Sequence, residues 1–243
     1  MQFSYKIKII YAVFVIANIQ LCTIAFAQVK AVKKPKIYRQ QAETDSMQRM
    51  TELKTLIPNI VYDLRYATKD NFTHKKLYQN GRQTFLRLPV ANALQKVQDN
   101  LNRKGYGLKI FDAYRPYTVT KTMWNLIHDE RYVADPSKGS GHNRGLSVDL
   151  TIINLIDGSE LNMGTGFDNF TDTAHQMFRN LPEDVLSNRK FLKETMEKYG
   201  FKALETEWWH YSWTNDRNYE VLDIDFKKLR NILTDVSPFF HQK

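Results

Sequence analysis

The sequence is poor in cysteine and contains no internal repeat or low-complexity tract. Its single cysteine among 243 residues excludes a disulfide framework and a zinc site built from several thiolates. Hydrophobic residues make up 42% of the chain and charged residues 25%. These values are ordinary for a globular protein and exclude a disordered chain, a collagen-like repeat and a polytopic membrane protein. Any metal site must therefore use histidine and carboxylate ligands.

The charge balance is positive, with 35 Lys and Arg against 26 Asp and Glu and a formal net charge of +9. A basic excess is one property of proteins that bind nucleic acid. Here, however, the basic residues are scattered and match no nucleic-acid-binding motif. We therefore expect no nucleic-acid partner.

The first 27 residues have the pattern of a secretory signal peptide. Lys6 and Lys8 precede an uncharged, mostly apolar run over 9–27 that ends in Ala25-Phe26-Ala27, an order typical of a cleaved leader. The alternative is an uncleaved membrane anchor, since about 18 apolar residues can cross a bilayer, and only then do we expect a membrane contact. Cleavage would also remove the one cysteine, which suits an oxidising compartment. We expect export out of the cytoplasm.

Three further regions follow the leader. Residues 28–50 are polar and rich in lysine, and we interpret them as an exposed lead-in. The folded domain is expected over 51–226. Residues 227–243 carry no motif and are interpreted as a C-terminal tail, either a short helix or disordered.

Within the domain, the sequence alternates between two periodicities. The clearest helix is 88–104, where Val90, Leu94 and Leu101 fall on one stripe and Pro89 lies in the first turn. The pattern predicts strands over 59–66, 108–112, 147–153 and 207–213, a turn at 157–158, and helices over 88–104, 118–129 and 188–199. Helices interspersed with antiparallel strands predict a single α+β domain with a central antiparallel sheet flanked by helices.

The first segment with unusual chemistry runs from Ser140 to Asp149 and reads Ser-Gly-His-Asn-Arg-Gly-Leu-Ser-Val-Asp. Glycines at 139, 141 and 145 permit a turn, so that His142 on a loop and Asp149 on the following strand can point to one place. A carboxylate in an apolar strand is costly to bury unless it is paired or bound to metal. The alternative is that Asp149 faces water on the polar side of its strand.

A second segment places Glu207 and His210 among Trp208, Trp209 and Tyr211. Aromatic surroundings lower the local dielectric constant, which favours a metal ligand and a general base with a raised pKa. The alternative is a hydrophobic core strand with an incidental ion pair.

Together, His142, Asp149 and His210 form a set of two histidines and one carboxylate. Three protein ligands leave a fourth position for water, which is the arrangement of a catalytic zinc site, and we expect one Zn²⁺ per chain. Zinc lowers the pKa of its bound water and polarises a substrate carbonyl. Glu207 could take the proton of that water and pass it to the leaving amine.

A third segment, 108–116, is predicted to be a strand that runs into a turn. Pro116 biases Arg115 towards an extended conformation. An arginine held in this way can stabilise the oxyanion of a tetrahedral intermediate. The alternative is a structural salt bridge.

These segments resemble the signatures of a known family. Asp112-Ala-Tyr-Arg-Pro116, the run from Ser140 to Asp149, and Glu207-Trp-Trp-His210 resemble the three motifs of the VanX-type D-alanyl-D-alanine dipeptidases, zinc peptidases that share a fold with the hedgehog signalling domain. The resemblance extends from about residue 56 to about residue 226. It implies zinc binding by His142, Asp149 and His210, with Glu207 as general base and acid and Arg115 at the oxyanion.

The resemblance also implies three substrate contacts. Tyr66 and Asp168 occupy the positions at which the family binds the free amino end of the dipeptide, and Ser140 occupies the position of a hydroxyl near the substrate. A carboxylate can pair with an ammonium group and so select an unblocked substrate. The alternative for Asp168 is a helix cap or a turn. The residues at 145–148 differ in side-chain size from the commonest form of the motif.

The activity implied is hydrolysis of D-alanyl-D-alanine, or of a similar D,D-dipeptide, during peptidoglycan turnover. Together with the leader, it implies export across the inner membrane to a bacterial periplasm. Two alternatives remain. A D,D- or L,D-carboxypeptidase acting on stem peptides would share every zinc residue. An inactive zinc-containing binding module would be expected to lack Glu207 or Arg115, and both are present. The sequence does not indicate an oligomeric state.

Overall fold

The computed structural model describes residues 29–79 and 81–236. The expected signal peptide and the end of the tail lie outside these residues. The helices are α1 (Pro35–Thr44), α2 (Leu53–Leu56), α3 (Leu88–Asn102), α4 (Tyr117–Ile127), α5 (Gly141–Arg144), α6 (Glu183–Glu197) and α7 (Phe226–Val236). The strands are β1 (Met50–Glu52), β2 (Val61–Tyr62), β3 (Phe85–Arg87), β4 (Tyr106–Asp112), β5 (Ser147–Asn154), β6 (Phe201–Leu204) and β7 (Glu207–Trp213).

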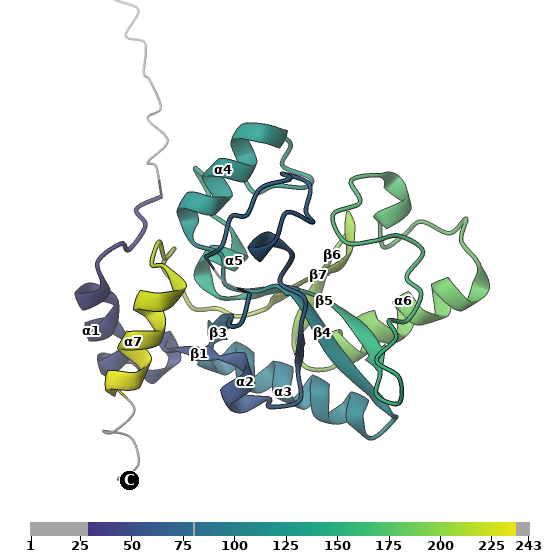
Figure 1. Ribbon diagram of the computed structural model, residues 1–243, viewed down its shortest axis with the longest axis horizontal. Helices are drawn as coiled ribbons and strands as arrows, with labels where there is room; N and C mark the ends of the chain where they lie inside the picture. Colours follow the sequence, from purple (N-terminus) through teal and green to yellow (C-terminus); the bar gives the residue numbers. More distant parts are fainter. Residues whose placement is uncertain (1–28, 80, 237–243) are drawn as a thin grey trace, which may run out of the picture.

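A five-stranded sheet of order β2-β4-β5-β7-β6 forms the centre of the fold, and β1 and β3 pair separately (Figure 1). The predicted α+β class is confirmed. The sheet is mixed, however, and not antiparallel throughout, because the edge strand β2 runs parallel to β4. The β4–β5, β5–β7 and β7–β6 pairs are antiparallel. Helix α3 lies between β2 and β4 in the chain, and it returns the chain to the edge of the sheet at which β2 began. A parallel pair of strands requires such a crossover.

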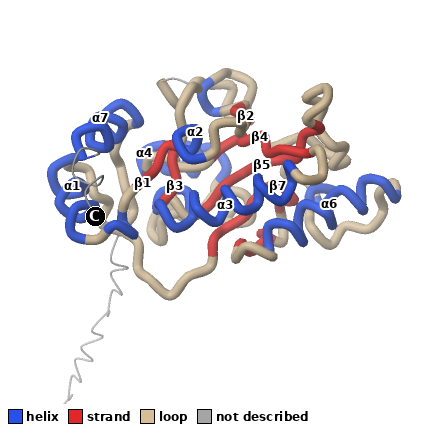
Figure 2. Tube along the Cα trace, turned by 90° about the horizontal axis from the view of Figure 1, so that it is seen from below, coloured by secondary structure: helices blue, strands red, loops and turns tan. Residues whose placement is uncertain are grey.

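Helices α3 and α6 cover one face of the sheet (Figures 1 and 2). The predicted stripe of α3 is confirmed, since Val90, Leu94 and Leu101 are fully buried. Burying each such side chain contributes roughly 1.5–3 kcal/mol. Helix α6 begins five residues before its predicted start, directly after Pro182, and β2 is shorter than the predicted strand. Helices α4 and α5 and the connecting loops lie on the opposite face of the sheet (Figure 1).

The interpretation of residues 28–50 as an exposed lead-in is wrong for α1. Tyr38 and Ala42 of this helix are buried, and the Tyr38 hydroxyl accepts a hydrogen bond from the Met50 backbone N–H at 2.6 Å. Helix α7 packs against α1 and buries Leu229 and Ile232. The composition did not predict this burial, because α1 is polar on average and only one side of the helix contacts the core.

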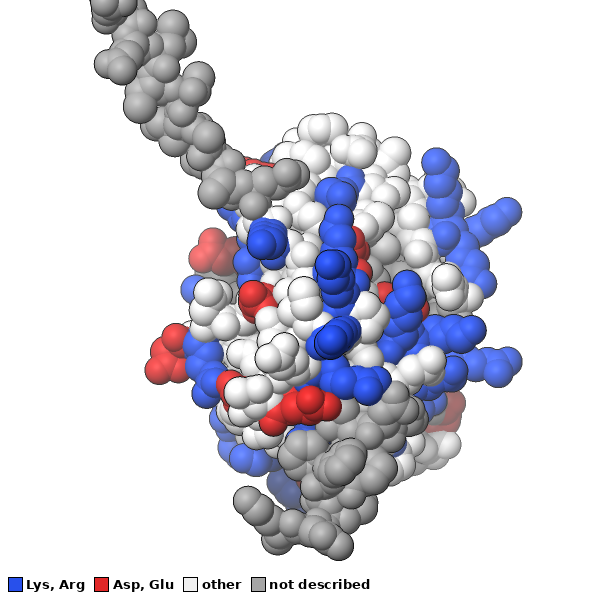
Figure 3. All heavy atoms as spheres, turned by 90° about the vertical axis from the view of Figure 1, so that its left-hand side faces the viewer, with Lys and Arg blue, Asp and Glu red and all other residues white. Residues whose placement is uncertain are grey.

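Lysine and arginine side chains are prominent on the side of the molecule that carries α1 and α7, with acidic side chains among them (Figure 3). In the described part of the chain, no helix combines the length and the apolar character needed to cross a membrane.

Candidate metal centre and active site

His142 is held by a short helix whose ends are both specified by the sequence. Ser140 is the N-cap of α5: its hydroxyl accepts a hydrogen bond from the His142 N–H at 3.1 Å, and its own N–H donates to the Asn143 side chain at 2.9 Å. This reciprocal capping box satisfies N–H groups at the helix start. Gly145 ends the helix with a φ of 70°, a conformation that favours glycine. His142 therefore lies on one helical turn, where a loop was expected, and its position is fixed.

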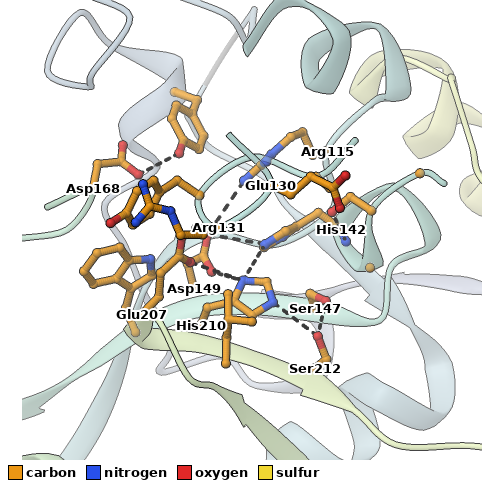
Figure 4. A pocket seen from close by; sticks show the side chains of 18 residues that line it. Arg115, Glu130, Arg131, His142, Ser147, Asp149, Asp168, Glu207, His210 and Ser212 are labelled. Atoms are coloured by element: carbon orange, nitrogen blue, oxygen red, sulfur yellow. Dashed lines mark hydrogen bonds and ion pairs between the residues drawn. The ribbon is translucent and has the colours of Figure 1, made fainter. Parts of the chain in front are cut away.

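The three expected metal ligands converge above the sheet (Figure 4). Asp149 on β5 and His210 on β7 are directly paired across the strands. The Nδ1 atom of His210 is 2.9 Å from Asp149 Oδ1 and 3.1 Å from His142 Nε2, and His142 Nε2 is 3.4 Å from Asp149 Oδ2. Ligands of a tetrahedral zinc with bonds of 2.0–2.2 Å are about 3.3 Å apart. The three side chains therefore fit a zinc ion.

Hydrogen bonds orient the ligands. The Nδ1 of His142 lies 2.7 Å from the carbonyl oxygen of Ala113. A carbonyl can only accept, so Nδ1 carries the proton and Nε2 keeps its lone pair for a metal. Burial alone would raise the pKa of Asp149, but the charges and hydrogen bonds of His142 and His210 outweigh burial and hold the pKa below its usual value. Asp149 is therefore a carboxylate ready to act as a ligand.

Glu207 begins β7 and is 95% buried beside the ligands. Its Oε2 lies 3.9 Å from His210 Nδ1. Burial raises the pKa of Glu207 well above its usual value, and the negative charges of Asp149 and Asp168 raise it further. A carboxylate with a raised pKa is a stronger base, which suits a group that must accept a proton.

Arg115 both makes a structural ion pair and reaches the centre. Its Nε and Nη2 contact Asp112 Oδ2 at 2.9 and 2.8 Å, and Nη2 is 3.8 Å from Asp149 Oδ2. Asp112 is fully buried and also accepts a hydrogen bond from the Tyr78 hydroxyl at 2.7 Å. The sequence reasoning assigned no role to Asp112. Its position three residues before Arg115 was the available signal.

Tyr66 lies on a 3-10 helix, Arg65–Ala67, and Asp168 lies on a loop far along the chain, and the two side chains meet in the site. The Tyr66 hydroxyl donates a hydrogen bond to Asp168 Oδ1 at 2.9 Å, while Asp168 Oδ2 is buried without a hydrogen-bond partner among the described residues. Burial raises the pKa of Asp168 to about 8. Its φ of 59° is left-handed, a conformation that aspartate adopts more readily than most residues.

All eight predicted site residues line one cavity of about 210 Å³. The structure thus brings them together, while the roles assigned to them stay predictions. Trp209, which was expected beside Glu207 and His210, also lines the cavity. Further lining residues had no expected role at the site, namely Glu130, Arg131, Tyr132, Ser147 and Ser212 among others. Of these, Ser147 lies inside a recognised motif. The loop at 130–132 carries no signal that links it to the site.

Comparison with known proteins gives three kinds of match. A family model described as D-ala-D-ala dipeptidase, peptidase M15, matches residues 46–228. The chain is 33% identical over 177 residues to D-alanyl-D-alanine dipeptidase of Escherichia coli K12, covering 73% of this chain and 91% of the relative. It is 32% identical over 179 residues to D-alanyl-D-alanine dipeptidase of Enterococcus faecalis, covering 65% and 88%.

Solved structures match more distantly. The LdcB LD-carboxypeptidase matches with a TM-score of 0.35 and 23% identity, covering 65% of this chain and 69% of that chain. A mutant of the vancomycin-resistance D,D-pentapeptidase VanY in complex with Zn(II) matches with a TM-score of 0.36 and 17% identity, covering 55% and 75%.

Proposed function

Because the chain belongs to the D-Ala-D-Ala dipeptidase family of metallopeptidases, peptidase M15, we propose that it hydrolyses D-alanyl-D-alanine, or a similar D,D-dipeptide, to free amino acids. One observation carries the proposal. His142, Asp149 and His210 place ligand atoms within 4.8 Å of one another, and Glu207 lines the same cavity. A metal and a base can therefore act on one substrate bond.

The donor set favours zinc. Two imidazoles and one carboxylate, without a thiolate, match the ligands of catalytic zinc sites, and we propose that one ion is held by His142 Nε2, His210 Nδ1 and Asp149. When bound, zinc lowers the pKa of a water ligand and polarises the scissile carbonyl.

Two residues of the chain then handle the proton and the charge. Glu207 takes a proton from the attacking water and delivers it to the nitrogen of the leaving amino acid. Arg115 stabilises the negative charge that develops on the carbonyl oxygen. Asp112 holds the guanidinium by its ion pair at 2.8 Å, so little rearrangement is needed as the charge develops.

In this proposal, Asp168 and Tyr66 restrict the enzyme to substrates with a free amino end. Within the described part of the chain, Asp168 Oδ2 has no hydrogen-bond partner and is available to the ammonium group of a dipeptide. Tyr66 holds the other carboxylate oxygen. The cavity of about 210 Å³ is smaller than the roughly 300–1,000 Å³ of sites for drug-sized ligands, which supports a small substrate. We further propose that the reaction takes place in the periplasm as part of peptidoglycan turnover.

A comparison of four substrates on one zinc-loaded preparation tests this function. D-Ala-D-Ala is expected to be cleaved fastest, and L-Ala-L-Ala, N-acetyl-D-Ala-D-Ala and a whole stem peptide much more slowly. Equal or faster cleavage of the stem peptide would favour a carboxypeptidase. Failure to cleave any of the four would contradict the proposed activity.

Asp168→Asn is expected to lower kcat/KM for D-Ala-D-Ala roughly 10- to 100-fold, because a hydrogen bond to a charged group contributes about 1.5–3 kcal/mol. Asparagine also adopts a left-handed φ readily, so the backbone should be preserved. The residual rate on N-acetyl-D-Ala-D-Ala should change little, since that substrate has no ammonium group.

Asp172→Asn is the matched control, because Asp172 lies four residues after Asp168, at the start of a 3-10 helix, and its side chain is 80% exposed. It should leave both rates unchanged. If Asp168→Asn loses the same factor in kcat/KM on the free and on the blocked dipeptide, Asp168 does not bind the amino end of the substrate.

A further inference from the structure

We propose that Ser147 and Ser212, here called the serine pair, position His210 so that it binds the metal through Nδ1. The inference rests on the proposed function only in taking His142, Asp149 and His210 as metal ligands. The proposed chemistry gives the serine pair no part in the reaction, yet both residues line the same cavity (Figure 4). They are positioning residues, since they act through His210.

The register of the sheet places the serine pair beside the metal ligands. Across β5 and β7, Ser147 is opposite Ser212 and Asp149 is opposite His210. Side chains two residues apart on a strand project from the same face. The two hydroxyls therefore form the cross-strand pair next to the pair of ligands, and their oxygens are 2.7 Å apart.

The contact with the imidazole is on the edge away from the metal site. Ser212 Oγ is 3.2 Å from His210 Nε2, whereas Nδ1 faces Asp149 at 2.9 Å. A neutral imidazole carries one N–H and one lone pair. If Nδ1 is to offer its lone pair to a metal, Nε2 must hold the proton, and that proton needs an acceptor. Ser212 Oγ supplies one.

The second serine offers the Ser212 hydroxyl an acceptor for its own proton. One contact is enough to fix the tautomer of His142, because its partner is a carbonyl, which can only accept. A hydroxyl can either donate or accept, so Ser212 alone would not fix the tautomer of His210. Ser147 is fully buried and lies within hydrogen-bond distance of Ser212. Either hydroxyl can donate in this contact. When the Ser212 O–H donates a hydrogen bond to Ser147 Oγ, the lone pairs of Ser212 face the imidazole. The hydrogen bonds then run from His210 through Ser212 to Ser147.

Gly141 leaves space for this arrangement. A Cβ atom at position 141 would lie 1.9 Å from Ser147 Oγ, so any side chain there would displace the hydroxyl. Gly141 directly precedes the ligand His142. The helix that carries one histidine ligand is therefore packed against the serine pair that orients the other.

The affinity of the full chain for zinc, measured by competition with a chromophoric chelator, tests the proposal. Ser212→Ala is expected to weaken zinc binding 10- to 100-fold, the usual effect of losing a group that orients a ligand. Ser147→Ala should weaken it less, because Ser212 remains but is no longer oriented. Ser212→Thr keeps the hydroxyl and should restore most of the affinity.

Thr151→Val is the matched control. Thr151 lies on β5 two residues beyond Asp149, is buried, and its hydroxyl has no hydrogen-bond partner in the described part of the chain. Its replacement removes a hydroxyl from the same face of the strand and should leave zinc affinity unchanged. Thermal unfolding of each metal-free variant identifies any that fails to fold.

Long-range ¹H–¹⁵N correlation spectra of the zinc-loaded protein give a second readout, because they show which nitrogen of His210 carries the proton. We expect protonated Nε2 in the wild type and in Ser212→Thr. Equal zinc affinity of Ser212→Ala and wild type, or an equal loss in Thr151→Val, would overturn the proposal. Neither measurement uses a substrate, so failure to hydrolyse D-Ala-D-Ala would refute the proposed function without deciding the role of the serine pair.

Discussion

Glu207→Gln is expected to lower kcat for D-Ala-D-Ala by about 10²- to 10⁴-fold, the range in which general acid–base catalysis contributes. Glutamine has nearly the same shape as glutamate but cannot take a proton from the attacking water. Glu207 lies 3.9 Å from His210 Nδ1 and is not needed as a ligand, so the variant should bind as much zinc as the wild type. Steady-state kinetics together with the zinc content of each preparation check both parts.

Glu205→Gln is the control for this change. Glu205 lies two residues before Glu207, and its side chain is exposed, so the substitution removes the same charge nearby without touching the cavity. Its kcat should equal that of the wild type. A Glu207→Gln variant that retains near-full kcat would mean that another group is the base. A variant that loses its zinc would mean that Glu207 supports the metal site.

The sequence predicted the centre of the site because its chemistry is concentrated in short segments. His142 and Asp149 lie within one motif, and the glycines around His142 already indicated a turn that could bring the two together. For His142 and Asp149, spacing along the chain therefore carried information about distance in space. Glu207 and His210 are close in the sequence, but residues three apart on a regular strand would face opposite sides. Both line the cavity, and the β6–β7 register is irregular where Leu204 pairs with Glu207.

Other features depend on which segments meet, and spacing carries no information about that. The hydrogen bond between Tyr66 and Asp168 joins residues 102 positions apart, and only the family resemblance placed both at the substrate. The pairing of Ser147 with Ser212 follows from the register of β5 and β7, which no local pattern specifies. Tyr38 was missed because a polar helix can still bury one side against the core.

Removal of the metal is expected to have the largest effect of all. Treatment with a strong chelator should lower kcat/KM for D-Ala-D-Ala by more than about 10³-fold, because zinc supplies several kcal/mol of transition-state stabilisation and each 1.4 kcal/mol is a factor of ten. Added Zn²⁺ should restore the rate at one ion per chain. Mg²⁺ should not, since it prefers oxygen ligands in octahedral geometry and the site offers two imidazoles.

The folded state should survive this treatment, which separates loss of catalysis from loss of structure. Unlike a zinc finger, which needs its metal to fold, this domain buries Leu108, Leu150 and Trp208 in a core around its central sheet. Far-ultraviolet circular dichroism of the chelated protein should therefore match that of the zinc-loaded protein. Full activity after metal removal, verified by elemental analysis, would contradict the metal-dependent mechanism.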